Sequence, residues 1–225
     1  GPRALEHMVD VVLYMEGESL SAWRLLRTVK NRFGSTNEVG ILEMTERGLV
    51  DVEDPSKAFL SERREGTVGS VIVSTMEGTR PLLAEVQALT TPAALAAPRR
   101  IATGIDFNRL LLVCAVLSRR VGMELSSQDI VVNVTGGLKV NEPAADLGVA
   151  AAVASSVRGR PIPANTVVFG EVGLGGEVRG AGQSLLRIRE AAQMGFTRCV
   201  LPARNVPEDS DPGIRVVGVS TLDEA

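Results

Sequence analysis

The sequence predicts an α/β or α+β fold, because stretches typical of strands and stretches typical of helices alternate along its 225 residues. Hydrophobic residues make up 44% of the chain and aromatic residues only 3%. The core therefore has to be built mainly from Val, Leu, Ile and Ala, as in α/β packing. A chain of this length can form one large domain, or a domain with an appendage.

The first part of the chain, residues 1–52, is predicted to be rich in strands. Strand-like runs cover 11–17, 23–34 and 39–52, and the tripeptides GST and ERG provide turn signals. Because the first strand comes almost at the start of the sequence and needs neighbours, we expect the chain to be a piece of a longer protein.

A polar connection, residues 53–68, is the predicted boundary between this β-rich part and a second unit, residues 69–225. The connection contains one short predicted helix, 55–60.

The second unit alternates between strands and helices. A helix is predicted over 107–122, because apolar residues recur there at helical spacing and Gly122 can end it. The apolar positions are Leu110, Val113, Leu117 and Val121. Strands are expected in 70–90 (a hairpin), 129–136, 166–180 (with a glycine-rich turn), 198–202 and the last run from 213. Further helices are expected in 145–157 and 182–196, and 97–106 is expected to be a loop.

Charge and cysteine content limit the function classes. The net charge of −3 argues against a globally basic nucleic-acid binder but leaves room for a local basic patch. Cys114 and Cys199 are far apart, and we expect buried thiols rather than a disulfide or a metal site. No apolar run reaches the length of a membrane span, so we expect a soluble, cytoplasmic protein with no membrane partner.

The segment NEPAADLG, residues 141–148, is a turn between a predicted strand and a predicted helix. The start of a helix in such a place can present backbone N–H groups to an oxyanion beside a nucleophile. This turn, however, contains no Ser, Cys or Thr.

The order of features in 69–225 resembles the proteolytic domain of Lon protease. In that family a G-P-S-A-G loop carries the serine nucleophile, and a lysine on a following helix is its base. The positions that correspond to this dyad are Ala144 and Leu185. Neither side chain can act as nucleophile or base, so the resemblance implies a Lon-like scaffold without peptidase activity. Leu185 is also expected to share an apolar helix stripe with Ile188 and Ala192.

A second motif, KNRFG, follows a strand-like run and precedes a turn. It comprises Lys30, Asn31, Arg32, Phe33 and Gly34. Lys30 and Arg32 are predicted to alternate on a strand and to point to one face, where two cations can meet a phosphate. A solvated strand face is the alternative. Phe33 is expected to anchor the strand and Gly34 to permit the turn.

KNRFG matches a signature of the RadA (Sms) family of bacterial DNA-repair proteins, and the sequence resembles that family over essentially all its residues. Residues 1–52 resemble the end of the RecA-like core with the KNRFG motif. Residues 69–225 resemble the family's Lon-like domain, which lacks the dyad.

The resemblance implies a full-length protein that carries a zinc finger and uses ATP and Mg. It would form a hexameric ring that hydrolyses ATP on single-stranded or branched DNA and drives branch migration in homologous recombination. The recombinase RecA would be a further partner. In the ring, Lys30 and Arg32 would contact ATP bound by a neighbouring subunit. The chain itself has no G-x-x-x-x-G-K-[ST] loop, so we expect no enzyme activity and no cofactor from it alone.

Pairs and clusters of arginine are candidates for DNA contact, since phosphate binding needs only positive charge and reach. The candidates are Arg99, Arg100, Arg119, Arg120, Arg179, Arg187 and Arg189. The alternative is that these arginines simply solvate the surface.

The sequence thus favours a proteolytically inactive scaffold for ring assembly and DNA binding. Two other interpretations stay open. A Lon-type serine peptidase would need the dyad that Ala144 and Leu185 replace. A pure oligomerisation module would show no salt-dependent binding of DNA.

Overall fold

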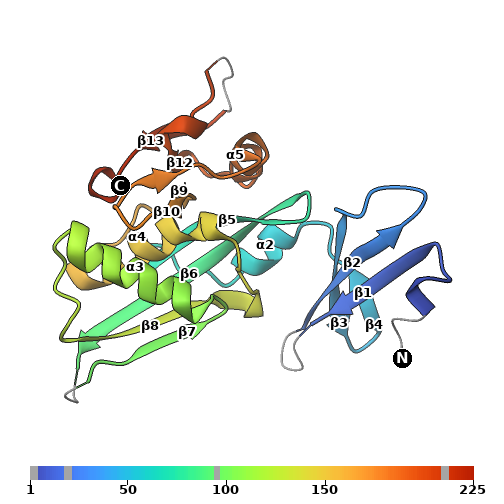
Figure 1. Cartoon of the computed structure of the whole chain (residues 1–225), viewed down its shortest axis with the longest axis horizontal. Helices are drawn as coiled ribbons and strands as arrows, with labels where there is room; N and C mark the ends of the chain where they lie inside the picture. Colours follow the sequence, from blue (N-terminus) through green and yellow to red (C-terminus); the bar gives the residue numbers. More distant parts are fainter. Residues whose placement is uncertain (1–4, 18–21, 94–96, 209–212) are drawn as a thin grey trace.

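A computed structural model describes residues 5–17, 22–93, 97–208 and 213–225, and it shows a mixed α/β fold with several sheets and helices. The predicted alternation of strands and helices is confirmed. Figure 1 shows a small sheet (blue) at one end of the molecule and a larger sheet with its helices at the other. The described part of the chain contains no helix that is both long and apolar enough to span a membrane.

The small sheet is an antiparallel meander with the order β1-β2-β3-β4. Its strands are β1 (Val11–Glu16), β2 (Trp23–Asn31), β3 (Val39–Thr45) and β4 (Gly48–Asp51). The predicted ERG turn joins β3 to β4, and Gly48 takes a φ of +103° there, which a residue with a Cβ adopts only with strain.

Helix α2 (Pro55–Leu60) connects the two sheets, as the sequence predicts. The Asp54 side chain caps it by accepting a hydrogen bond from the Lys57 N–H, and Pro55 suits the first turn because it needs no N–H there. Phe59 packs edge-on against Trp23 of β2, with ring centroids 4.9 Å apart. The division of the chain into units at 53–68 stays a prediction.

The large sheet has seven strands in the order β13-β12-β9-β5-β6-β8-β7. The strands are β5 (Ser70–Glu77), β6 (Arg80–Pro92), β7 (Arg100–Thr103), β8 (Gln128–Val134), β9 (Thr166–Val168), β12 (Arg198–Pro202) and β13 (Arg215–Val219). The β5–β6 hairpin and the β6–β8 pair are antiparallel, and the other pairs are parallel. A separate two-stranded hairpin, β10 (Glu171–Val172) and β11 (Val178–Arg179), forms in the glycine-rich run, as predicted.

The prediction of a loop over 97–106 is wrong, because β7 forms there and pairs in parallel with β8. This strand lies at the sheet edge and is only four residues long, too short to show a strand period in the sequence. Asp129 fixes the residue before this strand, because its carboxylate accepts hydrogen bonds from the backbone N–H and the guanidinium of Arg99.

Three longer helices cover the two faces of the large sheet: α3 (Phe107–Arg120), α4 (Asp146–Arg158) and α5 (Ser184–Gln193). Successive side chains of β5 point to opposite faces of the sheet and so belong to different parts of the core. Val71 and Val73 pack with the residues of α3 and α4, whereas Ile72 packs with those of α5. Of the predicted apolar positions, Leu110, Val113 and Leu117 are buried in α3, whereas Val121 caps the helix and is only partly buried. The predicted glycine at the helix end, Gly122, has a φ of +73°.

The two cysteines are free and buried, as predicted. Burial raises the pKa of both thiols, that of Cys199 to about 12.

Candidate functional site

The turn after β8 brings a predicted catalytic position into the core. The chain leaves β8 through a 3-10 turn and forms a second one at Pro143–Ala145, directly before α4. Ala144 is 3% exposed and packs in the apolar cluster of α5, and its carbonyl accepts a hydrogen bond from Gly170 N–H at 2.6 Å. A buried methyl group therefore occupies the position predicted for a nucleophile.

The second predicted dyad position is Leu185. Its side chain is 44% exposed and lines a shallow surface pocket with residues 204–208, so it belongs to no buried stripe with Ile188. The α5 side chain that reaches the turn is Arg187, whose guanidinium pairs with Glu142. Leu185 and Arg187 are two positions apart on α5 and therefore point in nearly opposite directions, so one is exposed and the other is buried.

The guanidinium of Arg187 is fully buried and fully engaged. It donates to the carboxylate of Glu142, to Ser74 O at 2.8 Å and to Gly182 O at 2.9 Å. Its Cζ also lies 5.4 Å from the centre of the Phe169 ring, within the range of a cation–π contact.

Glu142 also bonds to strand β5. Its second carboxylate oxygen accepts hydrogen bonds from Met76 N–H at 2.9 Å and from the Thr75 hydroxyl at 3.3 Å. Because arginine does not lose its proton in proteins, Arg187 cannot act as a general base. The geometry suits a crosslink between the turn, β5 and α5.

A second ion pair lies on the other side of the same turn. Asp146, the first residue of α4, accepts hydrogen bonds from the Arg109 guanidinium and from Val172 N–H at 3.2 Å. Burial raises the pKa of Asp146, while Arg109 acts in the opposite direction. Residues 143–145 are thus held between two ion pairs that sequence reasoning missed. The signal for them was available, because Glu142 and Asp146 flank a segment of apolar residues.

The KNRFG segment lies at the end of β2. The strand ends at Asn31, so Arg32 is just beyond it, and the prediction that Lys30 and Arg32 alternate on a strand is wrong. The Lys30 ammonium donates to Glu6 O at 2.8 Å, and the Arg32 guanidinium pairs with Asp10 at 3.2 Å. Both cations therefore contact the segment that precedes β1.

The tip of this segment is shaped by Asn31. Its amide donates to Ser35 O at 3.2 Å and accepts from Phe33 N–H at 3.0 Å. Phe33 is 78% exposed, so it does not anchor the strand as predicted. Gly34 does not take a positive φ either. The absence of a side chain at Gly34 instead lets the backbone pass close to Asn31, because a Cβ there would lie 3.1 Å from the Asn31 side-chain nitrogen.

The arginines proposed for DNA contact do not share one environment. Arg187 is buried, and in this fold it cannot reach a phosphate backbone. Arg99 pairs with Asp129, Arg100 donates to the carbonyls of Gln128 and Leu125, and Arg120 donates to Leu174 O.

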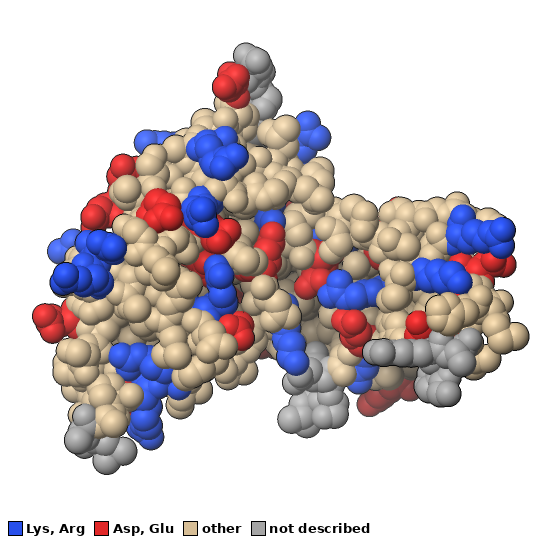
Figure 2. Space-filling model, viewed as in Figure 1, with Lys and Arg blue, Asp and Glu red and all other residues tan. Residues whose placement is uncertain are grey.

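Arg119, Arg179 and Arg189 are exposed, and Arg179 lies 3.9 Å from Glu177. Figure 2 shows the basic side chains of one face in several groups separated by acidic ones, not in one continuous patch.

Comparison with known proteins identifies relatives for the whole chain. The sequence model of the family described as subunit ChlI of Mg-chelatase matches residues 108–205, from the start of α3 to the turn after β12. Proteins named DNA repair protein RadA are 53% identical over 226 residues in Halalkalibacterium halodurans, 53% over 226 in Bacillus subtilis and 51% over 225 in Pseudomonas aeruginosa.

Each of these matches includes 100% of this chain and 49–50% of the relative. The chain thus spans about half the length of the curated relatives it matches. At this level of identity, it is homologous over its whole length to proteins named DNA repair protein RadA.

Proposed function

We propose that this chain is part of a DNA-repair ATPase of the RadA type, which acts in homologous recombination, branch migration and the processing of recombination intermediates. The similarity of the whole chain to proteins named DNA repair protein RadA supports this proposal. Residues 1–52 would be the end of a RecA-like core, and 69–225 a Lon-like domain that serves as a scaffold for ring assembly and DNA binding.

The ion pair between the buried Arg187 and the partly buried Glu142, beside Ala144, supports the assignment of a scaffold. The predicted nucleophile position holds a buried methyl group, and an ion pair lies beside it. The hydrogen bonds of the guanidinium join β5, α5 and the turn, which is a structural function.

The KNRFG segment is proposed to act between subunits, with Lys30 and Arg32 reaching ATP bound by a neighbour. The contact of Arg32 with Asp10 is exposed on both sides, and exposed ion pairs contribute only about 0–1 kcal/mol. A phosphate can therefore replace Asp10 at little cost. A pair of cations beside the γ-phosphate would stabilise the charge that develops during its transfer.

The further components belong to the whole protein in this proposal. ATP and Mg would bind to the RecA-like core and Zn to a zinc finger, while the assembly would be a hexameric ring. DNA, single-stranded or branched, and the recombinase RecA would be its partners.

The test measures DNA-dependent ATP hydrolysis by the whole protein in which this chain occurs. Lys30→Ala and Arg32→Ala are each assayed alone and mixed with subunits whose own phosphate-binding lysine is replaced. We expect each variant alone to be nearly inactive, and the mixtures to regain activity because some interfaces then combine two intact halves. Lys57→Ala, an exposed lysine on α2, is the matched control and should stay active.

Two results would count against the proposal. Absence of DNA-dependent hydrolysis in the wild-type protein would contradict the assigned function. Mixtures that never exceed the sum of their components would contradict only the action of Lys30 and Arg32 between subunits.

A further inference from the structure

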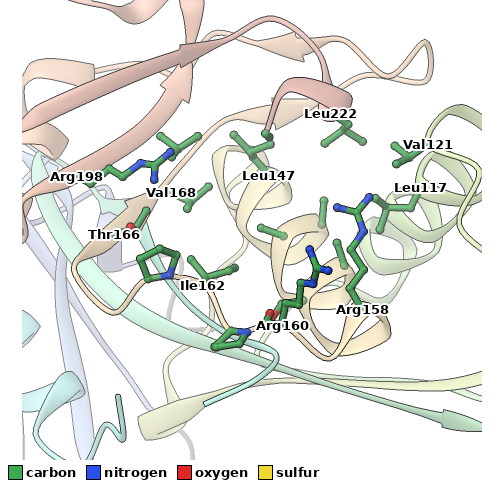
Figure 3. A pocket seen from close by; sticks show the side chains of 18 residues that line it. Leu117, Val121, Leu147, Arg158, Arg160, Ile162, Thr166, Val168, Arg198 and Leu222 are labelled. Atoms are coloured by element: carbon green, nitrogen blue, oxygen red, sulfur yellow. The ribbon is translucent and has the colours of Figure 1, made fainter. Parts of the chain in front are cut away.

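A cavity of about 290 Å³ lies between the C-terminal part of α3, the helix α4, the strands β9 and β12, and the end of the chain at 222–225. Aliphatic side chains form most of its wall, among them Leu117, Leu147, Ile162 and Val168, and no aromatic residue of the described part of the chain lines it (Figure 3). This volume is near the lower end of the range for ligand pockets, roughly 300–1,000 Å³, and accommodates one or two aliphatic side chains.

Three arginines surround this apolar wall: Arg158, Arg160 and Arg198. In Figure 3, Arg158 and Arg160 lie together on one side of the cavity and Arg198 lies on the other. Among the residues that the structure describes, none of the three forms an ion pair. The Nε of Arg198 is buried and has no hydrogen-bond partner there.

A buried hydroxyl points to a ligand independently of the arginines. Thr166 is 3% exposed and lines the cavity, yet its Oγ1 has no hydrogen-bond partner within the described residues. An unsatisfied buried polar group costs about 1–3 kcal/mol. A polar atom of a bound molecule would remove that cost, since a hydroxyl can both donate and accept.

The rim at the end of α4 is already ordered. The Ser155 hydroxyl donates to Arg160 O at 2.5 Å, and Arg160 N–H donates to Ser155 O at 3.1 Å. Gly159 ends the helix with a φ of +62°, which turns the chain toward Arg160. Binding therefore requires little rearrangement of the backbone at this side of the cavity.

We propose that this cavity binds an acidic peptide segment of a partner protein. One aliphatic side chain of the peptide enters the cavity, a peptide N–H or C=O pairs with the Thr166 hydroxyl, and carboxylates pair with Arg158, Arg160 and Arg198. Arginine suits this role because its planar fork matches a carboxylate.

The chemistry of the wall favours a peptide over DNA. Single-stranded nucleic acid is typically bound by aromatic side chains on which the bases stack, and the described residues place none in this wall. Phosphates would gain from the arginines but nothing from the aliphatic wall. This docking site is additional to the function proposed above and does not depend on it.

The test uses the whole protein and a fluorescein-labelled peptide, Glu-Asp-Leu-Asp-Glu, followed by fluorescence anisotropy. A peptide with Ser in place of Leu tests the aliphatic contact. Arg198→Gln and Arg158→Gln test the charge contacts, and Ala154→Leu fills the cavity from α4. Arg119→Gln, an exposed arginine at the end of α3 that does not line the cavity, is the matched control.

Arg158 is exposed, and exposed ion pairs contribute about 0–1 kcal/mol, so Arg158→Gln should raise Kd by up to about fivefold. Arg198 is partly buried, and hydrogen bonds to charged groups contribute about 1.5–3 kcal/mol, so we expect Kd to rise by about tenfold or more in Arg198→Gln. Ala154→Leu and the Ser peptide should weaken binding to a similar degree, and Arg119→Gln by less than about twofold. Thr166→Val separates binding from stability. It should leave the free energy of unfolding unchanged or increase it, and still weaken binding of the peptide.

Three outcomes would overturn the proposal. The first is no binding of the peptide by the wild-type whole protein, as expected if further residues of the same polypeptide fill the cavity. The second is equal binding by wild type and Ala154→Leu. The third is displacement of the peptide by a DNA oligonucleotide in wild type but not in Arg158→Gln, which would make the rim a phosphate site.

Discussion

The buried guanidinium of Arg187 forms an ion pair next to Ala144 with the carboxylate of Glu142, whose side chain is 26% exposed. Removing one member of such a pair leaves the other charge buried without compensation, whereas removing both does not. The pair therefore leads to one prediction about the free energy of unfolding and one about peptidase activity.

Glu142→Gln should destabilise the protein by about 3 kcal/mol, since it leaves the Arg187 charge buried without a counter-charge. The measurement is the free energy of unfolding from urea titration. Replacing both residues, as Glu142→Gln with Arg187→Met, should recover part of the loss. Glu124→Gln is the control, because Glu124 is exposed, and its effect should stay within about 0.5 kcal/mol. Equal effects of the substitutions at 124 and 142 would contradict a structural role for the pair.

We expect no peptidase activity from the wild-type protein, and none from the double variant Ala144→Ser/Arg187→Lys either. In that variant Glu142 would pair with the new lysine and keep it protonated, so the amine could not act as a base. The assay follows cleavage of unfolded casein and labelling by a serine-directed fluorophosphonate. Cleavage by the wild-type protein would refute the scaffold assignment, and cleavage by the double variant would refute the role given to Glu142.

Cys199 should make stability fall at alkaline pH. Its pKa is raised to about 12 in the folded protein by burial, against about 8.5 for an exposed thiol. The stabilising contribution is complete below the unfolded pKa and is lost as pH rises from about 8.5 to about 12. The slope attributable to this thiol approaches 1.4 kcal/mol per pH unit in that window.

This prediction is checked by urea unfolding between pH 7 and pH 10 for wild type and Cys199→Ala. The variant should lose stability less steeply with pH, whatever its stability at pH 7. Identical slopes would show that the thiol does not titrate on unfolding in this range.

DNA binding by the assembled protein should depend on exposed arginines and not on Arg187. With 27 acidic residues against 24 Lys and Arg, a single chain should bind DNA weakly, whereas a ring repeats each basic group around its axis. We expect Arg119→Glu/Arg120→Glu to reduce the slope of log affinity against log salt by about two, one for each phosphate that the arginines no longer neutralise.

The measurement is DNA affinity from 50 to 200 mM salt, with the oligomer mass checked for each variant. The control is Arg204→Glu, a single exposed arginine in the turn after β12. If the assembled protein binds no DNA, or if no reversal of an exposed arginine changes the slope, the domain is an oligomerisation module.

The fold was predictable wherever one rule governs an element. The apolar period of α3 indicated that Leu110 and Leu117 share one face, and both are buried. The short helix predicted over 55–60 forms as α2. Strand β7 escaped prediction because its existence depends on pairing with β8 and on the anchoring of Arg99 by Asp129. Contacts between residues 30 positions apart are not visible in a local pattern.

The candidate site was predictable in chemistry but not in geometry. The absence of a nucleophile at Ala144 follows directly from the sequence. A count of helix positions cannot show which side of α5 faces the turn, whereas the hydrogen bonds of Arg187 can. Phe33 was expected to anchor the strand, yet it follows the turn shaped by Asn31 and is exposed.

Trp23 is the only tryptophan of the chain, and it lies at the contact between the small sheet and Phe59 of α2. Its emission depends on the polarity around the indole ring and on the neighbouring aromatic group. The protein thus carries an intrinsic fluorophore at the junction of its two sheets. If binding of a nucleotide, DNA or a partner moves one sheet relative to the other, the wavelength and intensity of this single emitter report the movement without any added label.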